Sequence, residues 1–252
     1  MKERPTFPAR VKGVGEQVRT RPVPPGMDKP QGIGLDSGAV RQRMVEKLAA
    51  QGIRDAEVLA AMASVERHRF VDSALANQGY EDTSLPIGLG QTISKPSVVA
   101  RMVALLRNGN PAKMGRVLEI GTGCGYQAAL LSQLATEVYS MERLRGLHDK
   151  ARANLRPLFL PNVHLLFGDG MLGYPSGAPY AGIIAAAGGA SIPVAWIDQL
   201  AVGGRLVAPV CTTASGQGPG EQVLMVVDKT AQGLRRTTLE AVHFVPLKSG
   251  FA

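Results

Sequence analysis

The spacing of apolar residues predicts two helices near the start of the periodic part of the chain. Val40, Met44 and Leu48 recur at every fourth position and would form one apolar helix face, which Gly52 ends. Asp55 is suited to begin a second helix, because its carboxylate can accept the free backbone N–H groups of the first turn. The inward positions of this second helix are predicted to be Val58, Leu59, Met62 and Val65.

Residues 80–94 show no such period and contain one proline and two glycines, so a loop is predicted there. A helix is predicted from Pro96, a residue that fits the first turn of a helix, to Leu106. From Arg116 the pattern changes to short apolar runs that alternate with helical segments. The predicted strands are 117–120, 137–142, 163–168, 180–187 and 204–210, and the predicted helices are 126–135, 143–156 and Val194–Leu200.

This alternation predicts an α/β fold. Strand–helix–strand repeats with apolar strands are typical of a mostly parallel, doubly wound sheet that has helices on both faces. The last two apolar segments, 222–229 and 234–247, have no helix between them. They are therefore predicted to form an antiparallel pair at the C-terminal edge of the sheet.

The composition is that of an ordinary globular protein, with 45% hydrophobic and 19% charged residues. No apolar run approaches the roughly 20 residues that cross a bilayer, and the first residues lack the apolar stretch of a secretory signal. The two cysteines, Cys124 and Cys211, form no C-x-x-C pair, which argues against a zinc site or a disulfide framework. No metal is expected, and a reducing cytoplasm is the expected location.

The net charge is +8, and basic residues are dense at the start of the chain. Residues 1–36 hold seven Lys or Arg residues and six of the seventeen prolines, with no helical or strand period. They are predicted to be a disordered basic arm, followed by one domain at 37–252. Because this domain is only mildly basic, it is not expected to bind nucleic acid, whereas a weak contact through the arm stays open.

A glycine-rich loop follows the first strand of the α/β region, in the run VLEIGTGCGYQ. The dinucleotide-binding pattern G-x-G-x-x-G/A would need a small residue where this chain has Tyr126, and Glu119 precedes the first glycine by two residues. A carboxylate there would repel a pyrophosphate but suits the ammonium and sulfonium groups of S-adenosylmethionine. Three glycines would let the chain turn tightly and approach a ligand closely: Gly121, Gly123 and Gly125.

Two further acids support a nucleoside ligand. Glu142 ends the second strand, 21 residues after Gly121, where a carboxylate can bind ribose hydroxyls. Asp169 and Gly170 follow the third strand and could meet an adenine edge. The carboxyl ends of parallel strands share one edge of the sheet, so these residues are expected to converge on one cleft. The alternatives are a capping or salt-bridged acid for Glu119 and a solvated strand end for Glu142.

The residues also carry a family resemblance, which covers nearly all of residues 37–250. The chain resembles the protein-L-isoaspartate O-methyltransferases, and the segment LPIG-x-GQTIS-x-P is far more specific to them than the glycine loop. This segment lies within a longer similar run, FVDSALANQGYEDTSLPIGLGQTISKPSVVARM. The other similar segments are VLEIGTGCGYQAALLSQLATEVYSMER, GDGMLGYPSGAPY, IPVAWIDQLAVGGRLVAPV and VHFVPL.

The resemblance implies a Rossmann-like methyltransferase domain, with a helical, substrate-side segment at 37–110 and a cofactor-binding core at 111–252. It also implies transfer of a methyl group from S-adenosylmethionine to the α-carboxyl of L-isoaspartyl residues in aged proteins and peptides. S-adenosylhomocysteine would be the other product. The ester would then close to a succinimide, which begins repair. A monomer without a membrane partner is expected.

Matched position by position, Ser94 corresponds to the active-site serine of this family. The residues implied to bind the cofactor are Glu119, Gly121, Thr122, Gly123, Gly125, Glu142, Asp169 and Gly170. The residues implied to bind the substrate are Thr92, Ser94, Ile192 and Pro193.

Two features depart from the family pattern, and Cys124 is a further difference. Ala181 stands where an acid is common, and residues 186–193 read AAGGASIP where TAAAPEIP is frequent. Cys124 replaces a frequent serine and is interpreted as a small buried residue, because no histidine lies near it in the sequence.

The implied reaction needs no enzymic base. The nucleophile is the substrate carboxylate, which has a pKa of about 4 and is ionised at neutral pH. The four histidines are therefore interpreted as structural, and catalysis would rest on orientation, with a hydrogen bond from Ser94 or Thr92 fixing the carboxylate. The alternative for Ser94 is a helix cap before Pro96.

Other functions stay open on the sequence. A methyltransferase-like binding module that recruits partners through the basic arm is one, and a methyltransferase acting on another carboxylate or on a small molecule is another. An RNA or DNA amino-methylating enzyme is disfavoured, because such enzymes often carry N/D-P-P-Y/F after the fourth strand, where this chain reads AAGGAS.

Overall fold

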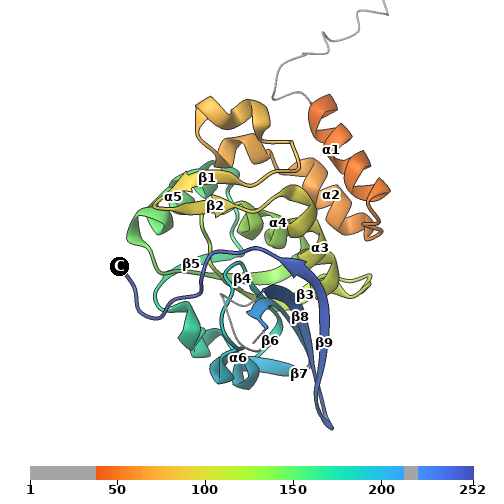
Figure 1. The fold of residues 1–252 in the computed structure, drawn as a ribbon, viewed down its shortest axis with the longest axis vertical. Helices are drawn as coiled ribbons and strands as arrows, with labels where there is room; N and C mark the ends of the chain where they lie inside the picture. The colour runs from red at the N-terminus through yellow and green to blue at the C-terminus, as the bar shows by residue number, and fades with distance from the viewer. Residues whose placement is uncertain (1–37, 213–220) are drawn as a thin grey trace, which may run out of the picture. The chain divides into compact units, whose positions relative to one another are not determined.

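The computed structural model describes residues 38–212 and 221–252. Seven strands form its central sheet: β3 (Met114–Ile120), β4 (Ala135–Glu142), β5 (Val163–Phe167), β6 (Tyr180–Ala185), β7 (Leu200–Cys211), β8 (Gln222–Thr230) and β9 (Gly233–Val242). Their order is β5-β4-β3-β6-β7-β8-β9 (Figure 1). The pairs from β5 to β7 are parallel, and β8 and β9 add antiparallel neighbours. The predicted α/β sheet with an antiparallel C-terminal edge is confirmed.

Helices cover both faces of this sheet. On one face, a large apolar cluster joins the sheet to α1 (Gly38–Ala50), α2 (Ala56–Ser64), α3 (Pro96–Arg107), α4 (Tyr126–Leu134) and α5 (Arg145–Leu155). On the other face, Trp196 of α6 (Val194–Gln199) packs with Leu118 and Ile120 of β3. Because side chains alternate along β3, the strand contributes to the apolar cores on both faces of the sheet. Short 3₁₀ helices span Arg67–Phe70, Ser73–Gln78, Arg156–Leu158, Gly170–Leu172 and Pro175–Gly177.

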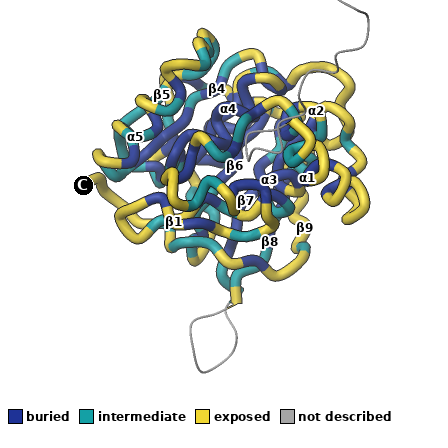
Figure 2. The backbone as a smooth tube through the Cα atoms, turned by 90° about the horizontal axis from the view of Figure 1, so that it is seen from above, coloured by how far each residue is buried: buried dark blue, intermediate teal, exposed yellow. Residues whose placement is uncertain are grey.

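Burial differs sharply between the middle and the edge of the sheet. β6 is buried at five of its six positions, whereas β9 is exposed along most of its length (Figure 2). β3 lies between β4, which follows it along the chain, and β6. The connections that leave β3 and β6 therefore run to opposite sides, and a crevice is expected between them at the carboxyl ends of the strands.

The predicted loop at 80–94 is wrong in part. It contains an antiparallel hairpin of β1 (Leu85–Gly88) and β2 (Gln91–Ile93). The turn between them uses Gly88, Leu89 and Gly90, whose φ angles are +99°, +53° and +69°. Strands of four and three residues are too short to leave a period in the sequence. Lys150 of α5 fixes this hairpin, because its Nζ donates a hydrogen bond to the Ile87 carbonyl at 2.8 Å.

The end of α1 near Gly52 and the start of α2 after Asp55 agree with the sequence prediction, but α2 ends at Ser64, so the predicted inward residue Val65 is its C-cap. Asp55 is the N-cap of α2, and its Oδ1 accepts hydrogen bonds from the backbone of Glu57 and Val58 at 3.1 Å each. Its Oδ2 pairs with the buried Arg107 of α3 at 3.0 Å. The ion pair ties α2 to α3, a contact that the capping signal alone did not indicate.

The predicted basic arm lies outside the described residues. Within residues 38–212 and 221–252, no helix combines the length and the apolar character needed to cross a membrane.

Candidate functional site

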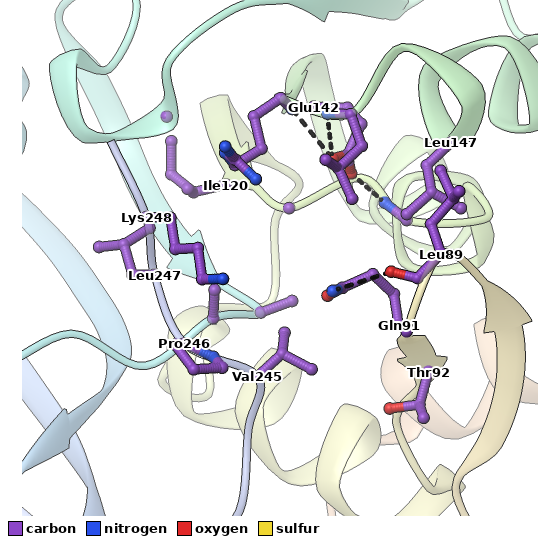
Figure 3. Close-up of a pocket in the computed structure, with 18 of the residues that line it drawn as sticks. Leu89, Gln91, Thr92, Ile120, Glu142, Leu147, Val245, Pro246, Leu247 and Lys248 are labelled. Atoms are coloured by element: carbon purple, nitrogen blue, oxygen red, sulfur yellow. Dashed lines mark hydrogen bonds between the residues drawn. The ribbon is translucent and has the colours of Figure 1, made fainter. Parts of the chain in front are cut away.

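A cavity of about 470 Å³ lies at the carboxyl ends of β3, β4 and β6. In Figure 3, Leu89 and Thr92 of the hairpin lie on one side of it, Val245 and Leu247 of the C-terminal segment lie opposite, and Glu142 stands at the end of β4. The remaining lining residues include Ile87, Gln91, Ile120, Gly121, Gly123, Met141, Leu144, Leu147, Gly170, Ala186, Ala187, Pro246 and Lys248.

The glycine loop forms the floor of this cavity. Gly121 and Gly123 line it at φ angles of +93° and +57°, which residues with a side chain rarely adopt. The backbone N–H groups of Gly121 and Thr122 both donate to the Met141 carbonyl, at 2.9 and 3.2 Å, and so hold the loop against β4. Gly125, the last glycine of the loop, does not line the cavity. A Cβ atom at Gly125 would come within 3.0 Å of Leu155.

Glu142 joins the glycine loop to the chain that follows β4 through its carboxylate. Its Oε2 accepts a hydrogen bond from the Gly123 N–H at 2.8 Å, and its Oε1 accepts from the N–H groups of Arg143 and Leu144 at 2.9 Å each. A carboxylate oxygen has two acceptor positions, so Oε2 keeps one free for a ligand hydroxyl. Glu142 lines the cavity as the sequence predicts, and it also orders the loop that surrounds it.

Glu119 is linked to Thr122 of the glycine loop through Ser140. Its side chain is fully buried and does not line the cavity. The Ser140 hydroxyl donates to Glu119 Oε2 at 2.5 Å, and Thr122 Oγ1 lies 2.6 Å from the Ser140 oxygen. Desolvation raises the pKa of Glu119 to about 8, against the hydrogen bond from Ser140, which lowers it. The predicted direct contact of Glu119 with a ligand stays a prediction, and its observed contacts favour a supporting role.

Asp169 and Gly170 occupy different places in the site. Asp169 Oδ1 accepts the Met171 N–H at 2.8 Å, and Oδ2 accepts the Gly250 N–H at 2.6 Å, so both oxygens bind the protein itself. Asp169 lines a depression next to the cavity, whereas Gly170 lines the cavity itself. A Cβ atom on Gly170 would lie 2.6 Å from Ile120, which explains a glycine at this close approach.

Ser94 lies in a crevice of about 40 Å³ that adjoins the cavity and shares Thr92, Gly121 and Gly123 with it. The alternative role of Ser94 as a helix cap is wrong. Lys95 is the N-cap of α3 and makes no side-chain capping bond, and Asp82 accepts the Ser97 N–H at 2.8 Å instead. The hydroxyl of Ser94 is therefore not committed to α3.

The other candidates divide between the site and its surroundings. Ile192 and Pro193, predicted to bind substrate, line neither the cavity nor the crevice, and neither does Ala181. Cys124 is buried as predicted, and desolvation raises the pKa of its thiol to about 11, which disfavours a nucleophilic thiolate. The four histidines all lie in the described ranges, and none of them lines the cavity or the crevice. In the described part of the chain, no three His, Cys, Asp or Glu side chains are grouped to hold a metal ion.

Sequence reasoning missed the C-terminal segment as a wall of the site. Val245, Pro246, Leu247 and Lys248 line the cavity, although the run VHFVPL gave no chemical signal. Gly188 holds this segment in place, because its N–H donates to the Val245 carbonyl at 2.9 Å and its carbonyl accepts the Leu247 N–H at 2.8 Å. The unusual loop after β6 thus pairs with the end of the chain.

Comparison with known proteins gives the same assignment as the sequence motifs. Residues 39–252 match the family described as protein-L-isoaspartate(D-aspartate) O-methyltransferase. The chain belongs to this family. A protein-L-isoaspartate O-methyltransferase of Methylibium petroleiphilum is 63% identical over 223 residues, which cover 88% of this chain and 81% of the relative. One from Leptothrix cholodnii is 56% identical over 250 residues, with coverages of 93% and 87%.

Solved structures of the family share the fold. A structure described as a protein-L-isoaspartate O-methyltransferase aligns with a TM-score of 0.74 at 28% identity, over 84% of this chain and 67% of the other. A Plasmodium falciparum structure, determined in complex with S-adenosyl-L-homocysteine, gives a TM-score of 0.69 at 23% identity, over 82% and 98%. The second likeness is one of fold alone.

The buried carboxyl of Glu119 predicts a pH dependence of stability. Its pKa is about 8 in the folded state against an ordinary value of 4.5, so between these values the folded state keeps a proton that the unfolded state releases. The stabilising contribution is full below about pH 4.5 and is lost as the pH rises through about 8. Glu119→Gln should therefore flatten the fall in unfolding free energy between pH 5 and 8 by roughly 1 kcal/mol per pH unit. Urea titrations at each pH measure this, and parallel slopes in the two proteins would contradict the buried neutral carboxyl.

Glu142→Gln should weaken ligand binding and stability together. The amide keeps one oxygen but turns an N–H₂ group toward backbone donors, so binding of S-adenosylhomocysteine should weaken by about 1.5–3 kcal/mol. The unfolding free energy should fall by about 1–3 kcal/mol. Glu137→Gln on the same strand is the matched control, because Glu137 is half-buried, lies outside the cavity and pairs with His164. Calorimetric titration and urea unfolding measure the two effects, and unchanged binding in Glu142→Gln would remove this carboxylate from the ligand site.

Proposed function

We propose that this protein transfers a methyl group from S-adenosylmethionine to the α-carboxyl of L-isoaspartyl residues in damaged proteins and peptides. The methyl ester then closes to a succinimide, which starts the repair of the chain. The observation that carries the proposal is the junction of two spaces at the glycine loop. The cavity that Glu142 lines and the crevice that Ser94 lines share Thr92, Gly121 and Gly123.

The cavity fits the proposed cofactor in size and chemistry. Its volume of about 470 Å³ lies within the range of roughly 300–1,000 Å³ that small-molecule sites occupy. The free acceptor position of Glu142 Oε2 suits a ribose hydroxyl, and the side chains of Ile120 and Leu144 offer apolar surface to a base. Gly121 and Gly123 let the backbone approach the ligand closely. When bound, S-adenosylmethionine supplies an electrophilic methyl group on a sulfonium.

The residues beside the crevice have the task of orientation. The substrate carboxylate is already ionised at neutral pH, so the protein does not have to remove a proton. The Ser94 hydroxyl, which is free of α3, can donate a hydrogen bond to one carboxylate oxygen and leave the other to react. Thr92 lines both spaces and can serve the same carboxylate or the loop. Holding the two reactants in line converts the encounter into an intramolecular step.

The departures from the family pattern do not favour another function. Ala181 is exposed on β6 and lines neither space. Ala186 and Ala187 line the cavity, Gly188 pairs with the C-terminal segment, and Gly189 pairs with β7. Glu142, Gly121, Gly123 and Gly170 line the cavity, so these departures leave the candidate cofactor site in place.

Paired peptides test this function directly. With labelled S-adenosylmethionine, the wild-type protein should methylate a peptide that contains isoaspartate and leave the matching aspartate peptide unlabelled. Ser94→Ala should lower kcat/KM for the isoaspartyl peptide by about 10- to 1000-fold, the scale of one catalytic hydrogen bond. Binding of S-adenosylhomocysteine should persist, and the wild-type rate should be flat from about pH 6 to 8, because no histidine takes part.

Ser97→Ala is the matched control for that variant. Ser97 lies three residues further on and contributes only its backbone N–H to the bond with Asp82, so its replacement should preserve the rate. Equal labelling of both peptides would contradict the proposed substrate. Full activity of Ser94→Ala would instead leave the proposed substrate assignment unchanged and would remove Ser94 from the mechanism.

A further inference from the structure

Arg67 is a fully buried cation next to the candidate site. It begins the 3₁₀ helix Arg67–Phe70, and none of the ion pairs among the described residues includes its guanidinium. Its Nη2 donates a hydrogen bond to the Ser94 carbonyl at 2.8 Å and a longer one to the Thr83 carbonyl at 3.5 Å. Its Nε and Nη1 have no hydrogen-bond partner within the described part of the chain.

The other face of the guanidinium contacts the helix that follows the glycine loop. The Arg67 Cζ atom lies 4.9 Å from the centre of the Tyr126 ring, in a cation–π contact. Tyr126 is the first residue of α4, directly after Gly125, and it lines the crevice together with Ser94. One side chain thus touches the segment that carries the candidate catalytic hydroxyl and the helix that starts at the cofactor loop.

Such an arrangement is costly for stability alone. A buried guanidinium without a carboxylate partner loses its hydration, and two of its nitrogens gain no hydrogen bond in exchange. Burial lowers the pKa of Arg67 from its ordinary value of 12.5, yet a guanidinium stays protonated at neutral pH. Buried polar groups that are incompletely satisfied in native proteins call for an explanation, and they often occur where function requires a fixed geometry.

We propose that Arg67 is a positioning residue that fixes Ser94 relative to the glycine loop. The hydrogen bond from Nη2 fixes the carbonyl of Ser94. The contact with Tyr126 fixes the guanidinium relative to α4, so the Ser94 carbonyl is fixed relative to α4 as well. The carbonyl carbon and the side chain of Ser94 are bonded to the same Cα atom, so a fixed carbonyl also restricts where the hydroxyl can lie. The inference rests on the proposed function, because the position of Ser94 matters only if its hydroxyl orients the substrate carboxylate.

A double-mutant cycle separates positioning from general stability. Arg67→Met keeps the length of the side chain and removes its charge and donors, and it should lower kcat for the isoaspartyl peptide by about 10- to 100-fold. In the Ser94→Ala background the same change should cost less than about 2-fold, because Arg67 acts through Ser94. Binding of S-adenosylhomocysteine, which does not depend on Ser94, should stay within about 2-fold in both backgrounds.

Arg107→Met is the matched control. Arg107 is also a buried arginine, but it pairs with Asp55 and lines neither the cavity nor the crevice. Below its melting temperature this variant should keep the wild-type kcat. Hydrogen–deuterium exchange gives a readout without turnover, because peptides covering residues 91–95 should exchange faster in Arg67→Met and unchanged in Arg107→Met. If Arg67→Met does not fold, Arg67→Lys replaces it, because lysine keeps the charge but lacks the planar guanidinium. Its kcat should fall less, and again more in the wild-type background than in Ser94→Ala.

Three results would overturn the positioning role. They are a wild-type kcat in the folded Arg67 variant, an equal loss with and without Ser94, and unchanged exchange over residues 91–95. A wild-type protein that leaves the isoaspartyl peptide unmethylated would contradict the proposed function instead, and the exchange measurement would still decide whether Arg67 holds the Ser94 segment.

Discussion

The carboxylate of Glu142 is the contact on which the candidate site depends. It gathers three backbone N–H groups from the glycine loop and from the chain that leads into α5, at 2.8–2.9 Å. Charge-assisted hydrogen bonds of this kind are stronger than neutral ones and fix the direction of each donor. The loop after β3 and the end of β4 are therefore held as one surface. Any ligand hydroxyl that binds the same carboxylate meets a site that is already formed.

Buried polar side chains continue this support around the loop. Six of the nine buried polar or charged residues of the described chain lie in the loop, on β3, β4 or α4 beside it, or against the Ser94 segment: Arg67, Glu119, Thr122, Gln127, Ser140 and Glu142. From Thr122 a chain of hydrogen bonds runs through Ser140 to Glu119, and Arg67 bears on the neighbouring Ser94 segment. Such groups cost free energy to bury, so their concentration beside one cavity indicates that the geometry there is more tightly specified than stability requires.

Local patterns predicted the elements and much of the site. The strand–glycine–helix run and the acid that ends β4 placed Gly121, Gly123 and Glu142 at one cavity, because parallel strands present their carboxyl ends together. What the sequence could not predict depends on contacts between distant segments. The partners of Arg67 lie 16 and 27 residues away, and the C-terminal wall of the cavity pairs with the loop after β6. Ile192 and Pro193 were placed near the substrate by resemblance alone and line neither space.

A crystal structure of the protein with S-adenosylhomocysteine and an isoaspartyl peptide tests the central claim most directly. We expect the ribose hydroxyls to bind Glu142 Oε2 and the sulfur to face the junction between the cavity and the crevice. The peptide carboxylate should accept a hydrogen bond from Ser94 and point its other oxygen toward that sulfur. A ligand bound outside the cavity, or a peptide carboxylate remote from Ser94, would contradict the view that these two spaces form one reaction centre.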